Sequence, residues 1–218
     1  MRYRFVSNDE CANVTGVAVV VDVLRAFSFA AYALAAGADR FILMDDLDEA
    51  LRTARSIPRA LVGKDGPPRD DFDLFNSPGQ LRQRDDIAGR TIVHRTGAGT
   101  VGAVAARAAA HVYCASFVVA GATIDRLRVL QEQEITFVIT GDQGHAEEDL
   151  ACAEYMAASL GHATVDPHPF LARAETAGER LQRAAAVGYP GVTKTTWDCA
   201  ASLTASTSRF ERPTRPAW

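Results

Sequence analysis

The strongest constraint on the fold is the β-branched run at residues 17–23, which Asp22 interrupts near its end. A strand that is apolar on both sides suits a sheet covered by helices on both faces, because neither face then meets water. Further short apolar runs alternate with alanine-rich or amphipathic stretches. This alternation indicates βαβ units and an α/β fold. We expect three layers, α/β/α, with a largely parallel sheet of about six strands.

The expected strands are residues 17–23, 40–44, 59–63, 91–94, 111–115 and 135–140. The expected helices are residues 28–37, 46–56, 101–110, 123–133, 147–160 and 176–187, with a short one that Ser77 caps and Pro78 begins. We expect one domain over residues 1–218, ending in an irregular C-terminal tail. Because ligands of parallel α/β proteins bind beyond the carboxyl ends of the strands, the candidate loops start at Asp22, Gly63, Thr96 and Thr140.

Composition narrows the class of protein. A net charge of -4 argues against nonspecific nucleic-acid binding, although a few arginines can still hold a small anion. No apolar run is long enough to cross a membrane, and residues 1–11 lack the apolar core of a signal peptide. The cysteines show no paired spacing, which favours free thiols and a cytoplasmic location. They are Cys11, Cys114, Cys152 and Cys199.

Asp22 and Arg25 are the first candidate pair. A carboxylate at the end of a buried strand needs a cation, a metal or several donors to offset its desolvation. Arg25 stands where the next helix begins, and a guanidinium there can clamp a phosphate through two parallel hydrogen bonds. The residues alone leave two interpretations open: a functional site, or an ion pair that ties strand to helix.

Two further loops can bind an anion. Asn76 and Ser77 stand at the start of a helix, where free backbone N–H groups bind anions, although capping by Ser77 is the commoner role. Gly97, Gly99 and Gly102 match GxGxxG between a strand and a helix. The next strand ends without the acidic residue that a dinucleotide site requires, so a simpler phosphate cradle with Thr100 remains.

Glu148 and Asp149 open a later helix. Acidic residues there can simply complement the helix dipole, or they can hold Mg²⁺, which prefers carboxylate oxygens and bridges them to phosphate. Other chemistries lack support in the sequence. No HExxH pair or GxSxG turn is present, and Leu24 replaces the second aspartate of the haloacid dehalogenase motif.

Taken together, these motifs resemble the 2-phosphosulfolactate phosphatase (ComB) family. The matching segments are VVDVLRA at 20–26, LVG at 61–63, FDLFNSP at 72–78, GT at 99–100, and EDL at 148–150 followed by Cys152 and Ala153. The resemblance implies an α/β/α, magnesium-dependent phosphatase that dephosphorylates 2-phospho-3-sulfolactate in coenzyme M biosynthesis.

A small phosphorylated anion is then the expected partner, with neither nucleic acid nor membrane, and a homodimer is left open. The resemblance places Mg²⁺ on Asp22, Glu148 and Asp149, and these residues with Arg25 are the expected catalytic group. The expected substrate-binding residues are Asn76, Ser77, Gly97, Gly99 and Thr100.

The sequence also departs from the family pattern. Lys64 stands where the family has a glutamate, Ala98 stands in place of an asparagine, and Thr-Gly-Asp at 140–142 replaces Cys-Ala-Gly. Lys64 inverts a charge near the expected site, which Asp65 could offset. These departures motivate a second hypothesis, a relative that binds a phosphorylated ligand without hydrolysing it. A third, a nucleotide-dependent oxidoreductase, rests on the glycine turn alone.

Overall fold

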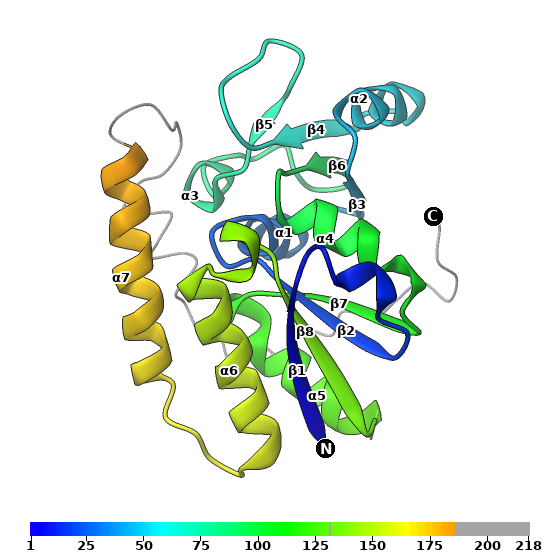
Figure 1. Cartoon of the computed structure of the whole chain (residues 1–218). Helices are drawn as coiled ribbons and strands as arrows, with labels where there is room; N and C mark the ends of the chain where they lie inside the picture. The colour runs from blue at the N-terminus through cyan, green and yellow to red at the C-terminus, as the bar shows by residue number, and fades with distance from the viewer. Residues whose placement is uncertain (131, 186–218) are drawn as a thin grey trace.

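The computed structural model describes residues 1–130 and 132–185. Helices pack around and between two parallel sheets (Figure 1). The strands are β1 (Arg2–Ser7), β2 (Val17–Val21), β3 (Arg40–Met44), β4 (Leu61–Lys64), β5 (Leu74–Phe75), β6 (Thr91–Arg95), β7 (His111–Ala115) and β8 (Glu134–Ile139). The α-helices are α1 (Ala26–Ala35), α2 (Leu47–Ser56), α3 (Pro78–Leu81), α4 (Gly99–Ala105), α5 (Ala120–Leu130), α6 (Glu147–Gly161) and α7 (His168–Ala185).

The strands form two four-stranded sheets, ordered β1-β8-β2-β7 (the first sheet) and β3-β6-β4-β5 (the second sheet). Every strand pair is parallel. The predicted α/β/α class with parallel strands is confirmed. The strands are divided between two sheets, however, and do not form one sheet of about six strands as expected.

The first sheet is buried on both faces, which explains the continuous apolar run. Val19 and Val21 of β2 share a core with Met156 of α6 and with residues of α5. Val20 points the other way and packs with Phe27 of α1 and with residues of α4. Because side chains alternate along a strand, a strand covered by helices on both sides must be apolar at every position.

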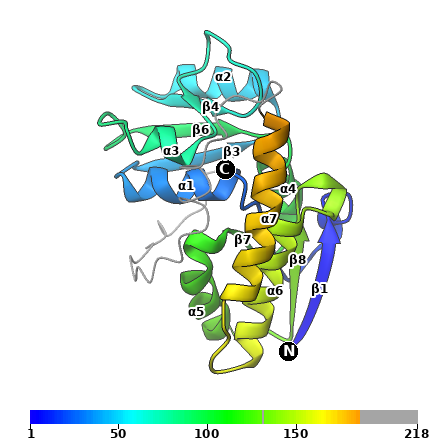
Figure 2. The same cartoon turned by 90° about the vertical axis from the view of Figure 1, so that its left-hand side faces the viewer.

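The second sheet is covered in the same manner. Ile92 of β6 packs with Phe29 of α1, and the next residue, Val93, packs with Leu51 of α2 on the opposite face. Helix α1 therefore contributes to the cores of both sheets, and Figure 2 shows it with α4 between them. Its sequence, AFSFAAYALA, is apolar nearly all round, as expected for a helix enclosed on two sides.

The structure adds elements that the sequence patterns missed. β1 is an edge strand whose Arg2 and Arg4 pair with Glu134, so its charges hid its apolar positions. β5 is a strand that was not expected, and α7 begins at His168 instead of residue 176. The expected helix end at residue 187, the tail and Cys199 lie outside the described residues, within which Cys11, Cys114 and Cys152 are free thiols.

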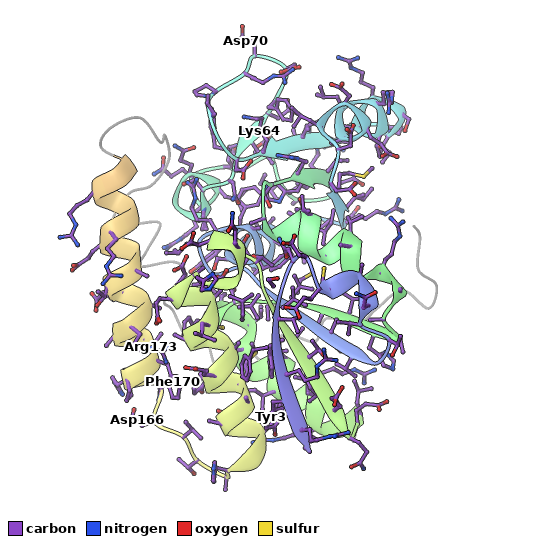
Figure 3. The ribbon with its side chains drawn as sticks, viewed as in Figure 1. Tyr3, Lys64, Asp70, Asp166, Phe170 and Arg173 are labelled. Carbon is purple, nitrogen blue, oxygen red and sulfur yellow. The ribbon has the colours of Figure 1, made fainter. Side chains whose placement is uncertain are left out.

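Helix α7 packs against α6 and forms ion pairs near its acidic N-terminus. Arg173 donates to Glu147 at 3.0 Å (Nη2 to Oε2) and also bonds Glu154 on the next turns of α6. Phe170 lies one turn away with its ring 5.7 Å from that of Tyr155, and Figure 3 shows both α7 residues facing α6. These contacts fix the helix that carries Glu148 and Asp149.

Candidate active site

Asp22 occupies the carboxyl end of β2, in the layer between the two sheets. Its carboxylate Oδ1 accepts the Ala26 N–H at 2.9 Å, and the Gly99 N–H also hydrogen-bonds this carboxylate. A Cβ at position 99 would lie 2.4 Å from Asp22 Oδ2, so only glycine lets the α4 entry approach so closely. The side chain is only 6% exposed.

Asp149, in the first turn of α6, lies against the same loop. Its Oδ1 accepts the Val23 N–H at 2.7 Å, and its Oδ2 accepts the Gly141 N–H at 3.1 Å. The carboxylate thus joins the loop after β2 to the loop after β8, which are neighbouring strands. The structure brings the aspartate of the early strand and the late acidic helix to the same side of the molecule.

Asp22, Glu148 and Asp149 form an acidic cluster whose members act on one another. The pKa of Asp22 is raised to about 6: burial and the charge of Asp65 raise it, while the Ala26 N–H, Arg25 and the Gly99 N–H lower it. Burial, Asp22 and Glu148 hold the pKa of Asp149 well above its usual range. Burial and Asp22 raise the pKa of Glu148. A proton or a cation would relieve this repulsion.

Arg25 is the buried cation beside this cluster. It is 6% exposed, it precedes the first residue of α1, and its peptide bond with Leu24 is cis. Its charge lowers the pKa of both Asp22 and His94. Burial is the larger cause at His94, whose pKa falls to about 3, so this imidazole is neutral and stacks 4.8 Å from the Phe29 ring.

The glycine turn between β6 and α4 is held by protein groups at each of its residues. The Gly97 N–H donates to Asp65 Oδ2 at 2.7 Å, and the Ala98 carbonyl accepts from Asn8 Nδ2 at 3.2 Å. The Thr96 N–H donates to Thr100 Oγ1 at 2.7 Å, and the Thr100 N–H donates back to Thr96 Oγ1 at 3.1 Å. The phosphate-binding roles of Gly97, Gly99 and Thr100 stay predictions. Each of these residues already forms a hydrogen bond with another protein group.

Asn8, at the end of β1, is a site neighbour that the sequence patterns missed. Its Nδ2 donates to the Thr140 carbonyl at 3.4 Å as well as to Ala98, and so it bridges the loops after β8 and β6. A Cβ on Gly102 would lie 2.4 Å from Asn8 Oδ1, which explains the last glycine of the turn. Asn8 could have been nominated if β1 had been recognised as a strand, because β1 pairs in parallel with β8 and the two strands end side by side.

Asn76 and Ser77 follow β5, at the edge of the second sheet, and are not on the strands that carry Asp22 and Asp149. Ser77 caps α3 by accepting the Gln80 N–H at 3.4 Å, with Pro78 at the first helical position, so the predicted cap is confirmed. Asn76 is 5% exposed, and its Oδ1 has no hydrogen-bond partner among the described residues. Their role toward a substrate stays a prediction.

Lys64 turns away from the α1 face of the second sheet. Gly63 faces His94 on that face, where a Cβ would lie 2.8 Å from the imidazole Cδ2, and alternation sends the next side chain to the α2 face. There Lys64 Nζ donates to the Pro67 carbonyl at 2.6 Å and lies 5.5 Å from the Phe72 ring centroid. Figure 3 shows Lys64 below the β4–β5 loop. Asp65, not Lys64, reaches the glycine turn.

The donor set of the acidic cluster suits a hard cation with few protein ligands. Within residues 1–130 and 132–185, no three His, Cys, Asp or Glu side chains are arranged to hold a metal ion. The carboxylates of Asp149 and Asp22 each accept two backbone N–H groups and keep further lone pairs for a cation, so Asp22, Glu148 and Asp149 all stay candidate ligands. Mg²⁺ commonly takes one or two carboxylates, several waters and a substrate phosphate, and these residues fit that pattern.

The fold and site define a class: parallel α/β proteins with a carboxylate cluster and a buried arginine beyond the carboxyl ends of their strands. Within it, the chain belongs to the 2-phosphosulpholactate phosphatase family, whose model matches residues 5–184. No helix in the described part of the chain is long and apolar enough to cross a membrane.

Several curated relatives support this membership, and each is named "Probable 2-phosphosulfolactate phosphatase". The chain is 39% identical over 150 residues to one from Thermus thermophilus, covering 66% of this chain and 62% of the relative. It is 35% identical over 158 residues to one from Deinococcus radiodurans, covering 69% and 65%. For one from Bacillus subtilis the identity is 30% over 140 residues, covering 63% and 61%. The chain thus matches less than two thirds of each relative's length.

Proposed function

We propose that this chain is a phosphatase that hydrolyses the phosphate monoester of a small acid, with 2-phosphosulfolactate as the first substrate to test. The observation that carries the proposal is the convergence of Asp22, Glu148 and Asp149 with the buried cation Arg25. Family membership and the names of the relatives support the substrate class.

In this proposal different residues bind the phosphate, bind the metal ion and position the loops. Arg25 clamps the phosphate and offsets the charge that develops during transfer. Asp22 and Glu148 would hold Mg²⁺ together with Asp149, which also keeps the Asp22 loop in place through the Val23 N–H. Bound there, Mg²⁺ would neutralise phosphate charge and lower the pKa of an attacking water. Asn76, Ser77 and the turn from Gly97 to Thr100 border the substrate.

The reaction breaks the phosphorus–oxygen bond to the hydroxy acid and forms one to the oxygen of water. Arg25 and the backbone around Asp22 must therefore orient the phosphate so that water attacks opposite the leaving oxygen. Because the hydroxy acid carries its own negative charge, a site with three carboxyl groups needs its cations to admit the substrate.

The test is phosphate release from 2-phosphosulfolactate and related phosphorylated hydroxy acids, with Mg²⁺ and with a chelator. Wild-type protein should release phosphate only with Mg²⁺. Asp22→Asn should abolish turnover, and Arg25→Lys should lower kcat/KM by about tenfold or more, because lysine cannot make the bidentate contact. The exposed Asp39→Asn should behave as wild type. Full activity of Asp22→Asn would refute the assignment.

One observation favours a second candidate, a relative that binds a phosphorylated ligand without hydrolysing it. The Gly97 N–H and the Thr100 hydroxyl already serve protein partners, so the turn offers phosphate fewer donors than expected. Ligand-dependent thermal stabilisation without phosphate release from any substrate would support it. The coenzyme M step, a cytoplasmic location and a homodimer stay predictions.

A further inference from the structure

Asp65 lies at the site, where the sequence marked it only as a charge that could offset Lys64. It directly follows β4, whose neighbour in the second sheet is β6, the strand that leads into the glycine turn. Since Gly63 faces His94, alternation brings Asp65 to the same α1 face as Thr96. From there its Oδ2 accepts the Gly97 N–H at 2.7 Å, within the range of a hydrogen bond.

The other contacts of the turn come from different directions. Asn8 of β1 binds the Ala98 carbonyl, and Asp22 of β2 binds the Gly99 N–H. Both of these residues belong to the side of the first sheet. Asp65 is the residue of the second sheet that holds the turn, at the position nearest to the end of β6. Without it, the Gly97 N–H would lose this hydrogen bond.

Asp65 is itself anchored by the loop that follows it. Lys64 Nζ holds the Pro67 carbonyl at 2.6 Å, and the Phe72 ring lies 5.5 Å from Lys64 Nζ and 5.3 Å from the Arg69 guanidinium. Arg69 is in turn paired with Asp71 at 2.7 Å. These contacts order the loop on both sides of Asp65, and the hydrogen bond to the Gly97 N–H sets the direction of its carboxylate.

We propose that Asp65 is a positioning residue of this site: by accepting the Gly97 N–H, its carboxylate holds the glycine turn in the conformation that keeps Asp22 and Arg25 productive. This inference rests on the proposed phosphatase function. The role belongs to the hydrogen-bond acceptor and not to the net charge. Asp65→Asn, which keeps a carbonyl oxygen at that place, should therefore preserve function, and Asp65→Ala should not.

The first measurement does not depend on activity. Hydrogen exchange of the Gly97 amide, followed by NMR, should be unchanged within about threefold in Asp65→Asn and about tenfold faster or more in Asp65→Ala, since a lost hydrogen bond opens the amide. Asp70→Asn, an exposed residue at the tip of the same loop (Figure 3), is the matched control and should exchange as wild type. Unchanged protection in Asp65→Ala would overturn the proposal.

The second measurement is steady-state kinetics at saturating Mg²⁺. Asp65→Ala should lower kcat by about tenfold while KM changes less, because the ground-state phosphate still binds Arg25. Asp65→Asn should recover at least half of wild-type kcat, whereas a purely structural defect would lower the melting temperature and leave the kcat of the folded fraction unchanged. Equal kcat losses in both variants would overturn the acceptor role. A wild-type protein without activity would refute the proposed function. The exchange rate of the Gly97 amide would still test its hydrogen bond to Asp65.

Discussion

The Asp22→Asn substitution should stabilise the folded protein above neutral pH even as it removes the proposed activity. Burial, with the charge of Asp65, raises the pKa of Asp22 from 3.8 to about 6. The folded chain therefore holds this proton more tightly than the unfolded chain does. The resulting stabilisation is complete below about pH 4 and is lost as the pH rises through about 6. At pH 8 the ionised carboxylate opposes folding.

The size of the effect follows from the same pKa. A difference of about two units corresponds to about 3 kcal/mol of folding free energy. Asparagine keeps one acceptor for the Ala26 N–H but brings an amino group toward the Gly99 N–H, which costs about 1 kcal/mol. The net gain at pH 8 is then about 2 kcal/mol, or about 4 to 8 °C in melting temperature for a chain of this size.

The assay is urea unfolding of the wild type, Asp22→Asn and the exposed control Asp39→Asn at pH 8 and pH 4, in metal-free buffer with a chelator. The gain of Asp22→Asn should be present at pH 8 and absent at pH 4. His94 has the opposite pH dependence, because burial lowers its pKa to about 3, but it is common to all three proteins and cancels in the comparison. Equal or lower stability of Asp22→Asn at pH 8 would refute the claim that this buried charge opposes folding.

Three further predictions concern other contacts. Gly102→Ala places a Cβ 2.4 Å from Asn8 Oδ1 and should cost about 1–3 kcal/mol in urea unfolding, whereas Gly121→Ala, with nothing within 4 Å, should cost nothing. Arg173→Ala removes the exposed pairs with Glu147 and Glu154 and should cost about 1 kcal/mol or less, with a smaller loss at high salt; a loss above about 3 kcal/mol would contradict a screened surface pair. Mg²⁺ should raise the melting temperature of the wild type, a chelator should reverse the shift, and Asp22→Asn should show little of it; an equal shift in that variant would place the cation elsewhere.

The sequence predicted those parts of the fold in which local pattern and burial agree. The β2 run reads as a strand because both of its faces are covered, and Asp46 and Ser77 cap their helices as side chains of this type do elsewhere. β1 escaped notice because an edge strand carries charged residues on its solvent side. β5 escaped notice because two residues are too few to form a pattern.

The sequence likewise predicted some of the site residues and missed others. Asp22, Arg25, Glu148 and Asp149 could be nominated from the chain, because strand ends and helix starts in parallel α/β proteins point to one edge. The contacts of Asn8 and Asp65 could not, because β1 was not recognised as a strand and Asp65 stood out only as a charge that could offset Lys64. Their importance arises from residues about 90 and 32 positions away, whose backbone groups they bind.

The amino-acid order alone thus determined the α/β class, the parallel strands and the identity of the acidic and basic groups, because these follow from periodicity and from residue chemistry. Tertiary structure alone decided that the strands divide between two sheets sharing α1, that Lys64 faces α2 while Asp65 faces the glycine turn, and that the turn's backbone groups are held by side chains. Those outcomes depend on which segments meet in space, and distant contacts leave no local trace in a chain.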